Sequence, residues 1–256
     1  MKRHVEVNRD HWNQMAADWV AAGERNWAAA LPDWGEWGVP EAELELLPTD
    51  MTGLSAIELG CGTGYVSAWM ARRGAQVTAI DISSAQLATA RRLAAQHALD
   101  RAITFLEGSA EAVPCPDASF DFAISEYGAA IWCDPDLWIP EAARLLRPGG
   151  RLVFLGSHPL TILATPADGS PCEPVLHRPY RDLRMADWTD VEVDPGGIEF
   201  NRTFEAWLAL FRRTGFDVVA YRELYAPHDA TSAPFAVPAE WAKSWPSEQV
   251  WVLDKR

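Results

Sequence analysis

The chain has 256 residues, 48% of them hydrophobic, which is enough for one well-filled domain and a cap. Its formal net charge of −14 argues against a protein that binds DNA, RNA or an anionic membrane, because that binding depends on a basic surface. No apolar run is long enough to span a membrane, and residues 1–8 lack the apolar stretch of a signal peptide. The four cysteines form no C-x-x-C pair, so we expect no metal site. Together these features predict a cytoplasmic protein with reduced thiols.

The first 50 residues are expected to form a helical cap. Apolar residues at helical spacing, Trp12 and Trp19 among them, predict a helix over residues 8–23, and a second short helix is expected over residues 41–47. This segment precedes the first predicted strand, so the sheet does not need it. Trp12 and Trp19 could attach the helix to the core, line a ligand pocket, or do both.

Residues 56–64 form a short apolar strand that ends in three glycines at alternate positions, Gly60, Gly62 and Gly64. A helix-like stretch over residues 65–73 follows. Glycine allows a sharp turn and lets a ligand lie against bare main chain, and the first amides of a helix attract an anionic or polar group. The pattern predicts a nucleotide-binding turn, with a plain strand-to-helix connection as the alternative.

A second predicted strand, residues 77–81, ends in Asp81, which lies 17 residues beyond Gly64. In a doubly wound sheet, that carboxylate reaches the tip of the neighbouring strand and can accept hydrogen bonds from both ribose hydroxyls. The alternative is a helix cap, but Ser83 and Gln86 already form an S-x-x-Q capping box for the next helix. Ile82 would then lie against adenine or take part in ordinary packing.

The spacing G-x-G-x-G, with Glu58 two residues ahead of it, resembles motif I of the class I S-adenosylmethionine (SAM)-dependent methyltransferases. It differs from the dinucleotide fingerprint G-x-G-x-x-G, whose third glycine would fall on Tyr65. The run S-F-D at residues 119–121 and L-L-R-P-G-G-R-L-V-F at residues 145–154 also match the family. The resemblance covers about residues 50–157.

The resemblance implies a doubly wound α/β fold whose seven-stranded sheet is mostly parallel, with an antiparallel last strand. It also implies SAM as cofactor and S-adenosylhomocysteine (SAH) as product. Ser109 stands where the family has an aspartate that bonds the adenine amino group, which leaves the backbone of Ala110 to meet adenine. The predicted cofactor-binding residues are Glu58, Gly60, Cys61, Gly62, Gly64, Asp81, Ile82, Ser109, Ala110, Glu111 and Ser125, with Trp12 and Trp19 from the cap.

The remaining elements complete one methyltransferase domain over residues 51–256, after the cap at residues 1–50. Asp134-Pro135-Asp136 is typical of a helix start, and Pro148-Gly149-Gly150 is expected to stop that helix. Residues 158–200 are rich in proline and are expected to form an irregular insertion on the substrate side. A last helix is expected near residues 204–211, and final strands over residues 216–224 and 249–253.

Methyl transfer from SAM is an in-line displacement at a carbon bound to a positively charged sulfur. Positioning can supply about 7–11 kcal/mol of the barrier reduction, whereas a general base adds about 3–5 kcal/mol. We therefore expect positioning to be the main catalytic contribution. The catalytic candidates at strand tips are His158, Glu126 and Tyr127, and a loop-capping role is the alternative for His158.

Trp132, His177 and Tyr180 are the predicted substrate-binding residues. The sequence thus predicts SAM-dependent methyl transfer to a small, aromatic or apolar molecule, at oxygen or nitrogen. Two alternatives stay open: an NAD(P)-dependent oxidoreductase on a similar sheet, and a protein that binds SAM without catalysis. Tyr65 in place of the third dinucleotide glycine argues against the first.

Overall fold

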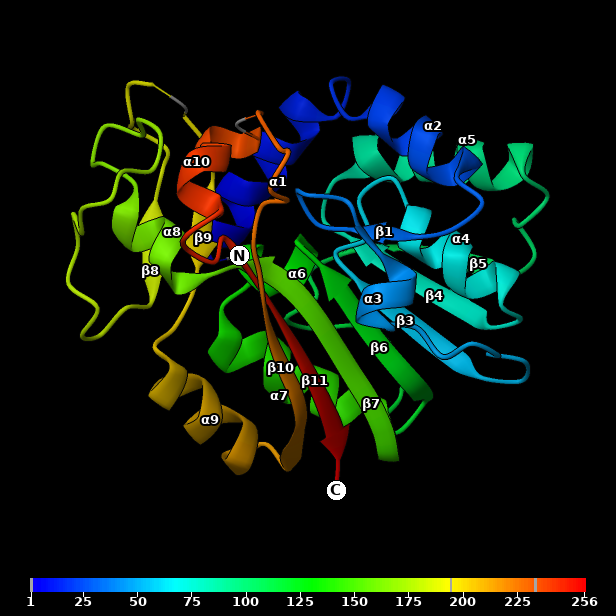
Figure 1. Ribbon diagram of the computed structural model, residues 1–256. Coiled ribbons are helices and arrows are strands. Elements are labelled where there is room, and N and C mark those ends of the chain that lie inside the picture. Colours follow the sequence, from blue (N-terminus) through cyan, green and yellow to red (C-terminus); the bar gives the residue numbers. More distant parts are fainter. Residues whose placement is uncertain (1, 194, 233) are drawn as a thin grey trace.

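The structure is a computed structural model that describes residues 2–193, 195–232 and 234–256 (Figure 1). Its centre is a seven-stranded sheet in the order β10-β11-β7-β6-β3-β4-β5. Five neighbouring strands, β7 to β5 in that order, are parallel, and β11 pairs antiparallel with both β7 and β10. The strands are β3 (Ser55–Leu59), β4 (Gln76–Asp81), β5 (Ile103–Glu107), β6 (Phe120–Glu126), β7 (Leu146–Ser157), β10 (Phe216–Leu224) and β11 (Glu248–Lys255). The predicted fold class is confirmed.

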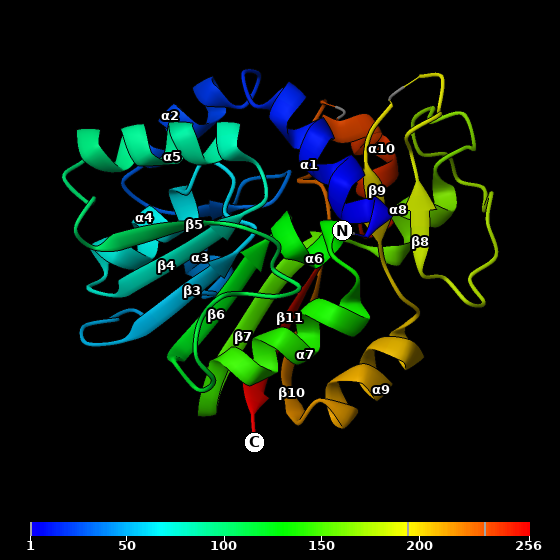
Figure 2. The same ribbon diagram turned by 180° about the vertical axis from the view of Figure 1, so that it is seen from behind.

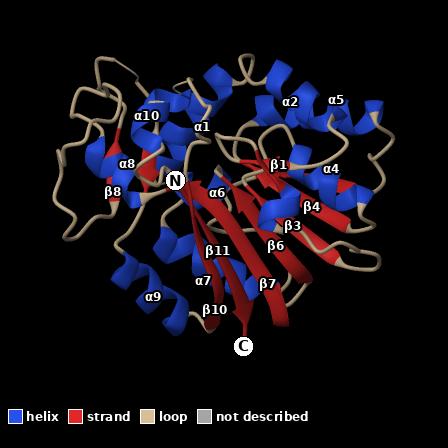
Figure 3. Cartoon of the chain, in the orientation of Figure 1, coloured by secondary structure: helices blue, strands red, loops and turns tan. Residues whose placement is uncertain are grey.

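Helices cover both faces of this sheet (Figures 2 and 3). Side chains alternate between faces along a strand, so Ala56 joins one core and Ile57 the other. The first core holds side chains of α2, α4 and α5, and the second holds side chains of α6, α7 and α9. The helices are α2 (Val20–Ala28), α4 (Tyr65–Arg72), α5 (Ser84–Gln96), α6 (Gly128–Trp132), α7 (Pro135–Leu145) and α9 (Phe204–Arg213).

Two predicted helix starts are confirmed. The Ser83 side chain accepts a hydrogen bond from the amide of Gln86 at the start of α5, and Asp134 caps α7, whose first residue is Pro135. The predicted stop of α7 was wrong. The helix ends at Leu145, and the Pro148-Gly149-Gly150 run lies inside β7, because the amide of Ser119 already pairs with the carbonyl of Leu145 and draws the chain into the sheet.

The N-terminal segment lies across the end of the sheet at which the parallel strands finish (Figure 1). It contains α1 (Arg3–Met15), α2, a two-stranded hairpin of β1 (Asp33–Trp34) and β2 (Val39–Pro40), and α3 (Glu41–Leu44). The single helix predicted over residues 8–23 is therefore two helices, separated between residues 16 and 19. No proline or glycine marks that break, so hydrophobic spacing alone does not reveal it.

The insertion after β7 and the long connection before β11 form a small lobe beside α1 (Figures 1 and 2). The lobe is largely irregular, as predicted, with short elements embedded in it. They are α8 (Pro159–Ala164), β8 (Met185–Asp187), β9 (Ile198–Phe200), the 3-10 turn η1 (Pro234–Ala236) and α10 (Ala239–Ala242). Among the described residues, no helix combines the length and apolarity that a membrane span requires.

Candidate active site

A cavity opens at the carboxyl ends of β3, β4 and β6, beneath α1, which is where ligands bind in open α/β sheets. Most of the residues predicted from the sequence line it. They are Trp12, Trp19, Glu58, Gly60, Cys61, Gly62, Asp81, Ile82, Ser109, Ala110, Glu126, Tyr127 and Trp132. A second cavity, about 440 Å³ in volume, lies between residues 41–49 and the strands β7 and β11, and none of the predicted site residues line it.

The glycine turn is fixed from two sides. Gly60 has a φ of 80° and packs on α6 so closely that a Cβ there would lie 2.6 Å from the amide nitrogen of Ala129, so only glycine fits. On the other side, the amide of Gly62 donates a 2.7 Å hydrogen bond to Oδ2 of Asp81, whose Oδ1 accepts a 2.8 Å bond from the amide of Ser83. Each Asp81 oxygen keeps a second lone pair for a ligand hydroxyl.

Two carboxyls beneath the turn, the buried Glu58 and the half-buried Asp81, have raised pKa values. Burial raises the pKa of Asp81, although the two amide donors oppose the shift. Glu58 is 2% exposed and accepts hydrogen bonds from the backbone and the hydroxyl of Ser67, and burial raises its pKa to about 8. Glu58 thus anchors the first turn of α4 under the glycine loop.

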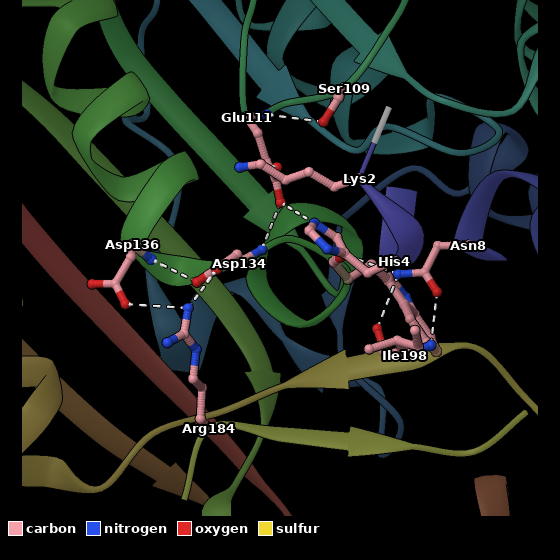
Figure 4. Close-up of polar contacts among 10 residues, drawn as sticks. Lys2, His4, Asn8, Ser109, Glu111, Asp134, Asp136, Arg184 and Ile198 are labelled. Atoms are coloured by element: carbon pink, nitrogen blue, oxygen red, sulfur yellow. Dashed lines mark hydrogen bonds and ion pairs between the residues drawn. The ribbon is translucent and has the colours of Figure 1, made fainter. Parts of the chain in front are cut away.

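Asn8, which is 2% exposed, holds the helix α1 over the cavity through side-chain hydrogen bonds (Figure 4). Its Nδ2 donates to the carbonyls of Trp132 and Ile198, both at 2.9 Å, and its Oδ1 accepts from the amide of Ile198 at 2.7 Å. One side chain therefore joins α1, α6 and β9. Two of these bonds are buried and the bond to Trp132 is partly buried. Opening residues 1–50, which form a lid over the cavity, would therefore leave polar groups without partners.

Glu111 is among the residues predicted to bind the cofactor. In the structure it contacts the N-terminal end of α1 (Figure 4). Its Oε1 lies 2.6 Å from Nε2 of His4 and accepts a 2.8 Å bond from the amide of Asp134, while Lys2 lies 3.6 Å from its Oε2. Asp134 in turn pairs with Arg184 of the insertion. Glu111 does not line the cavity, because its carboxylate faces the lid instead.

Three tryptophan rings, those of Trp12, Trp19 and Trp132, form one wall of the cavity. The ring of Trp12 packs edge-on against Trp19 at 5.7 Å and against Trp132 at 5.3 Å between centroids. Trp19 is stacked with Phe235 at 5.7 Å. Among the described residues, the Trp12 indole nitrogen is buried without a hydrogen-bond partner. The cavity side of α1 is thus an aromatic surface that carries one unused donor.

Two phenols and two carboxyls meet at the tip of β6. Tyr65 donates to Oε2 of Glu126, whose Oε1 accepts a 3.1 Å bond from the amide of Gly35. Tyr127 donates a 2.7 Å bond to Oε1 of Glu248. Burial raises the pKa of Glu126. This arrangement is acidic, and among the described residues no lysine, arginine or histidine lines the cavity.

Three residues predicted to take part in catalysis or substrate binding, His158, His177 and Tyr180, do not line this cavity. His158 is 2% exposed, and its Nδ1 caps α8 by accepting a 3.1 Å bond from the amide of Leu160. His177 lies 3.3 Å from Glu173, and Tyr180 accepts a hydrogen bond from the amide of Phe204. Each of the three contacts residues of the insertion or its neighbours instead.

Two further predicted residues shape the cavity without lining it. Gly64 has a φ of 78° and begins α4. The Ser125 hydroxyl donates to the carbonyl of Leu59 and accepts from the amide of Ala130, so it joins β3 to α6. Sequence reasoning also missed lining residues, Asn8 and Tyr65 among them, because nothing local distinguishes them from ordinary helix residues.

The family model described as a methyltransferase domain matches residues 57–154. Malonyl-[acyl-carrier protein] O-methyltransferase of Pectobacterium atrosepticum is 40% identical over 131 residues, which are 51% of this chain and 45% of that protein. Fatty-acid O-methyltransferase of Mycolicibacterium smegmatis is 31% identical over 112 residues, 43% of this chain and 39% of that protein. The matched part spans less than half the length of these curated relatives.

Solved structures extend the likeness beyond the matched segment. The SAM-dependent methyltransferase of Mesorhizobium loti has a TM-score of 0.65 at 25% identity, covering 84% of this chain and 96% of that chain. Geranyl diphosphate C-methyltransferase of Streptomyces coelicolor A3(2) has a TM-score of 0.66 at 13% identity, covering 100% and 99%. The second likeness concerns the fold alone.

Proposed function

We propose that this chain, which belongs to the class I SAM-dependent methyltransferases, transfers the methyl group of SAM to a small, neutral or amine-bearing acceptor with an aromatic or apolar body. The observation that carries this proposal is the single cavity on which the glycine turn, Asp81 and the tryptophan wall converge. Its location at the strand tips is the expected place for a nucleoside cofactor and its substrate.

The residues present fit SAM. Gly60 and Gly62 leave bare main chain for the methionine end, Asp81 would accept the ribose hydroxyls, and Ser109 and Ala110 would meet adenine. Bound SAM supplies an electrophilic methyl group on a positively charged sulfur. Buried carboxyls are therefore suitable neighbours for it, because a cation stabilises their ionised form.

The charge of the lining favours some acceptors over others. Glu58, Asp81 and Glu126 face the cavity, and the described lining includes no cationic side chain. A carboxylate acceptor would be buried there beside other carboxyls and without a cationic side chain to pair with, which is unfavourable. A hydroxyl or an amine can instead donate a hydrogen bond to these oxygens, so we propose O- or N-methylation of a phenol, alcohol or amine. This differs from the malonyl and fatty-acid groups in the names of the relatives.

Catalysis by this site would depend mainly on positioning. Trp12, Trp19 and Trp132 would hold an apolar body in line with the methyl group, and the lid of residues 1–50 would exclude water. Such alignment is worth about 7–11 kcal/mol.

The four cysteines are free thiols, which supports a cytoplasmic location.

Binding is tested by titration calorimetry of ligand-free protein with SAM, SAH and NADH. We expect SAM and SAH to bind and NADH not to bind. Failure of both SAM and SAH would overturn the proposal, and binding of NADH alone would favour the oxidoreductase alternative.

The acceptor class is tested with SAM that carries a radiolabelled methyl group. The panel contains 4-methylphenol, benzylamine, benzoate and decanoate at equal concentration. We expect label on the phenol or the amine and not on the two carboxylates. Label on a carboxylate alone would overturn the acceptor assignment, and SAM binding with no transfer to any of the four would favour a non-catalytic SAM-binding protein.

A further inference from the structure

Tyr127 stands between the cavity and a pair of buried carboxyls, Glu36 and Glu248. It lines the cavity, and its hydroxyl donates a 2.7 Å hydrogen bond to Oε1 of Glu248. The same oxygen accepts a 3.0 Å bond from the backbone amide of Glu36. Glu248 is fully buried. A hydrogen-bonded path therefore leads from the cavity through a phenol to a carboxyl that solvent does not reach.

The pair lacks the partners that two ionised carboxylates need. Among the described residues, Oε2 of Glu36 and Oε2 of Glu248 are both buried without a hydrogen-bond partner. The titratable groups that face them are Glu126, Glu199, Tyr127 and Cys172, none of them cationic. Two negative charges in a buried environment without cationic partners are unfavourable, so we expect at least one of the two carboxyls to hold a proton.

The direction of the pKa shifts agrees with this geometry. Burial raises the pKa of Glu248 to about 7, and burial together with the charge of Glu248 raises the pKa of Glu36 well above its ordinary value. Burial also raises the pKa of the Tyr127 phenol well above its ordinary range. Near neutral pH the pair can therefore gain or lose one proton, whereas the phenol can only pass a proton on.

Strained backbone conformations hold Tyr127 and Glu248 against each other. Tyr127 has a φ of 56°, a conformation that residues other than glycine rarely adopt, and its amide donates to the carbonyl of Leu155 at 2.9 Å. Gly35 has a φ of 71°, and a Cβ there would lie 2.8 Å from the Glu248 carboxyl carbon. Strained or glycine-only backbone on both sides brings the phenol and the carboxyl together.

We propose that Tyr127 and Glu248 form the proton-accepting relay of the methyl transfer, and that the positive charge of bound SAM releases a proton held by the pair of Glu248 and Glu36. The proposal rests on the proposed function. Tyr127 is the residue that would touch the acceptor, and Glu248 acts through it as a positioning and proton-storing residue.

The step balances without any further reactant. The acceptor oxygen or nitrogen forms its bond to the methyl group while the sulfur–methyl bond breaks, and that electron pair stays on sulfur. The proton of the acceptor moves to the Tyr127 oxygen, and the phenol proton moves to Oε1 of Glu248. The positive charge on sulfur and the negative charge on Glu248 disappear together, so no net charge builds up in the buried site.

Proton release on binding tests the proposal without knowledge of the acceptor. SAM carries the positive sulfur and SAH does not, so each is titrated at pH 7 in phosphate and in Tris, whose ionisation heats differ. In the wild-type protein we expect SAM to release more protons than SAH. Glu248→Gln should reduce that difference while still binding both ligands, because Glu58, whose pKa is also raised, can still release a proton. Glu223→Gln, on the neighbouring strand, should preserve the difference in full.

Tyr127→Phe separates the two halves of the proposal. It removes the relay but keeps the carboxyl pair, so the extra proton released by SAM should persist. Methyl transfer to 4-methylphenol should fall by about 10²- to 10⁴-fold, and transfer to 4-nitrophenol, which loses its own proton far more readily, should fall much less. A variant that is merely misfolded would lose both activities equally.

Three results would overturn the relay. Equal proton release by SAM and SAH in the wild type would remove the charge-driven step. An unchanged difference in Glu248→Gln would assign that proton to another group. Equal losses on both phenols in Tyr127→Phe would remove the proton transfer. Failure of both SAM and SAH to bind is a different result, which would overturn the proposed function itself.

Discussion

The acid at the tip of β4 is bonded to the glycine turn at the tip of β3: Oδ2 of Asp81 accepts a 2.7 Å hydrogen bond from the amide of Gly62. The residue proposed to hold the ribose therefore also fixes the loop proposed to hold the methionine end. The two halves of the cofactor site are coupled through this bond, so a substitution on one side should also weaken ligand binding on the other.

Asp81→Ala should weaken SAM binding by about 1–3 kcal/mol, because it removes an acceptor of charge-assisted hydrogen bonds. It should also weaken binding of methionine alone, because the Gly62 amide loses its partner. Titration calorimetry with SAM, adenosine and methionine measures both effects. Asp81→Asn, which keeps one oxygen, should lose less. Unchanged affinity for SAM in the alanine variant would remove the ribose assignment.

Asn8→Ala should loosen the lid. It leaves the amide of Ile198 and two carbonyls without buried partners, which costs about 1–3 kcal/mol of the free energy of unfolding. We also expect faster dissociation of SAM, measured by stopped-flow tryptophan fluorescence. Gln14→Ala, at an exposed position of the same helix, is the matched control. Identical dissociation rates in the two variants would argue against α1 as a lid.

His158→Asn should change the acid side of the stability profile. Burial lowers the pKa of His158 from 6.5 to about 4, so the neutral imidazole stabilises the fold above pH 6.5, and this contribution is lost as the pH falls toward 4. The loss is at most about 3 kcal/mol. Asparagine can still cap α8 but does not titrate. Urea unfolding at pH 7 and at pH 4 should show a smaller drop in the variant, and equal drops would contradict the assignment.

Ser109→Asp should strengthen SAM binding. The serine hydroxyl now accepts only a 3.2 Å bond from the amide of Glu111, and an aspartate there could accept a hydrogen bond from the adenine amino group. A hydrogen bond of this kind contributes about 0.5–1.5 kcal/mol. Calorimetry should show the gain with SAM and no gain with an N6,N6-dimethyladenine analogue. An equal gain with both ligands would mean that adenine lies elsewhere.

The parts of the site that could be predicted are those with a local signal. Four features depend on only a few neighbouring residues: the glycine spacing, the acid at the end of the next strand, and the caps at Ser83 and Asp134. The structure contains all four. The parallel arrangement of the central strands follows from the alternation of strand and helix along the chain.

The parts that could not be predicted depend on partners far away in the sequence. Asn8 bonds Ile198 across 190 positions, and Glu248 meets Tyr127 across 121. No spacing rule connects such residues. His158 shows the converse problem, because a histidine before a proline at a strand end is as typical of a helix cap as of a catalytic base, and only the fold decides between them.

The contact of His4 and Lys2 with Glu111 has a practical consequence for work with this protein. A purification tag fused ahead of Lys2 would be attached directly to the segment that contacts Glu111, near the proposed adenine site. The opposite terminus follows β11 at the end of the sheet that faces away from α1 (Figure 1). Affinity handles, fluorophores and surface-immobilisation chemistry therefore belong at Arg256, where they leave ligand entry undisturbed.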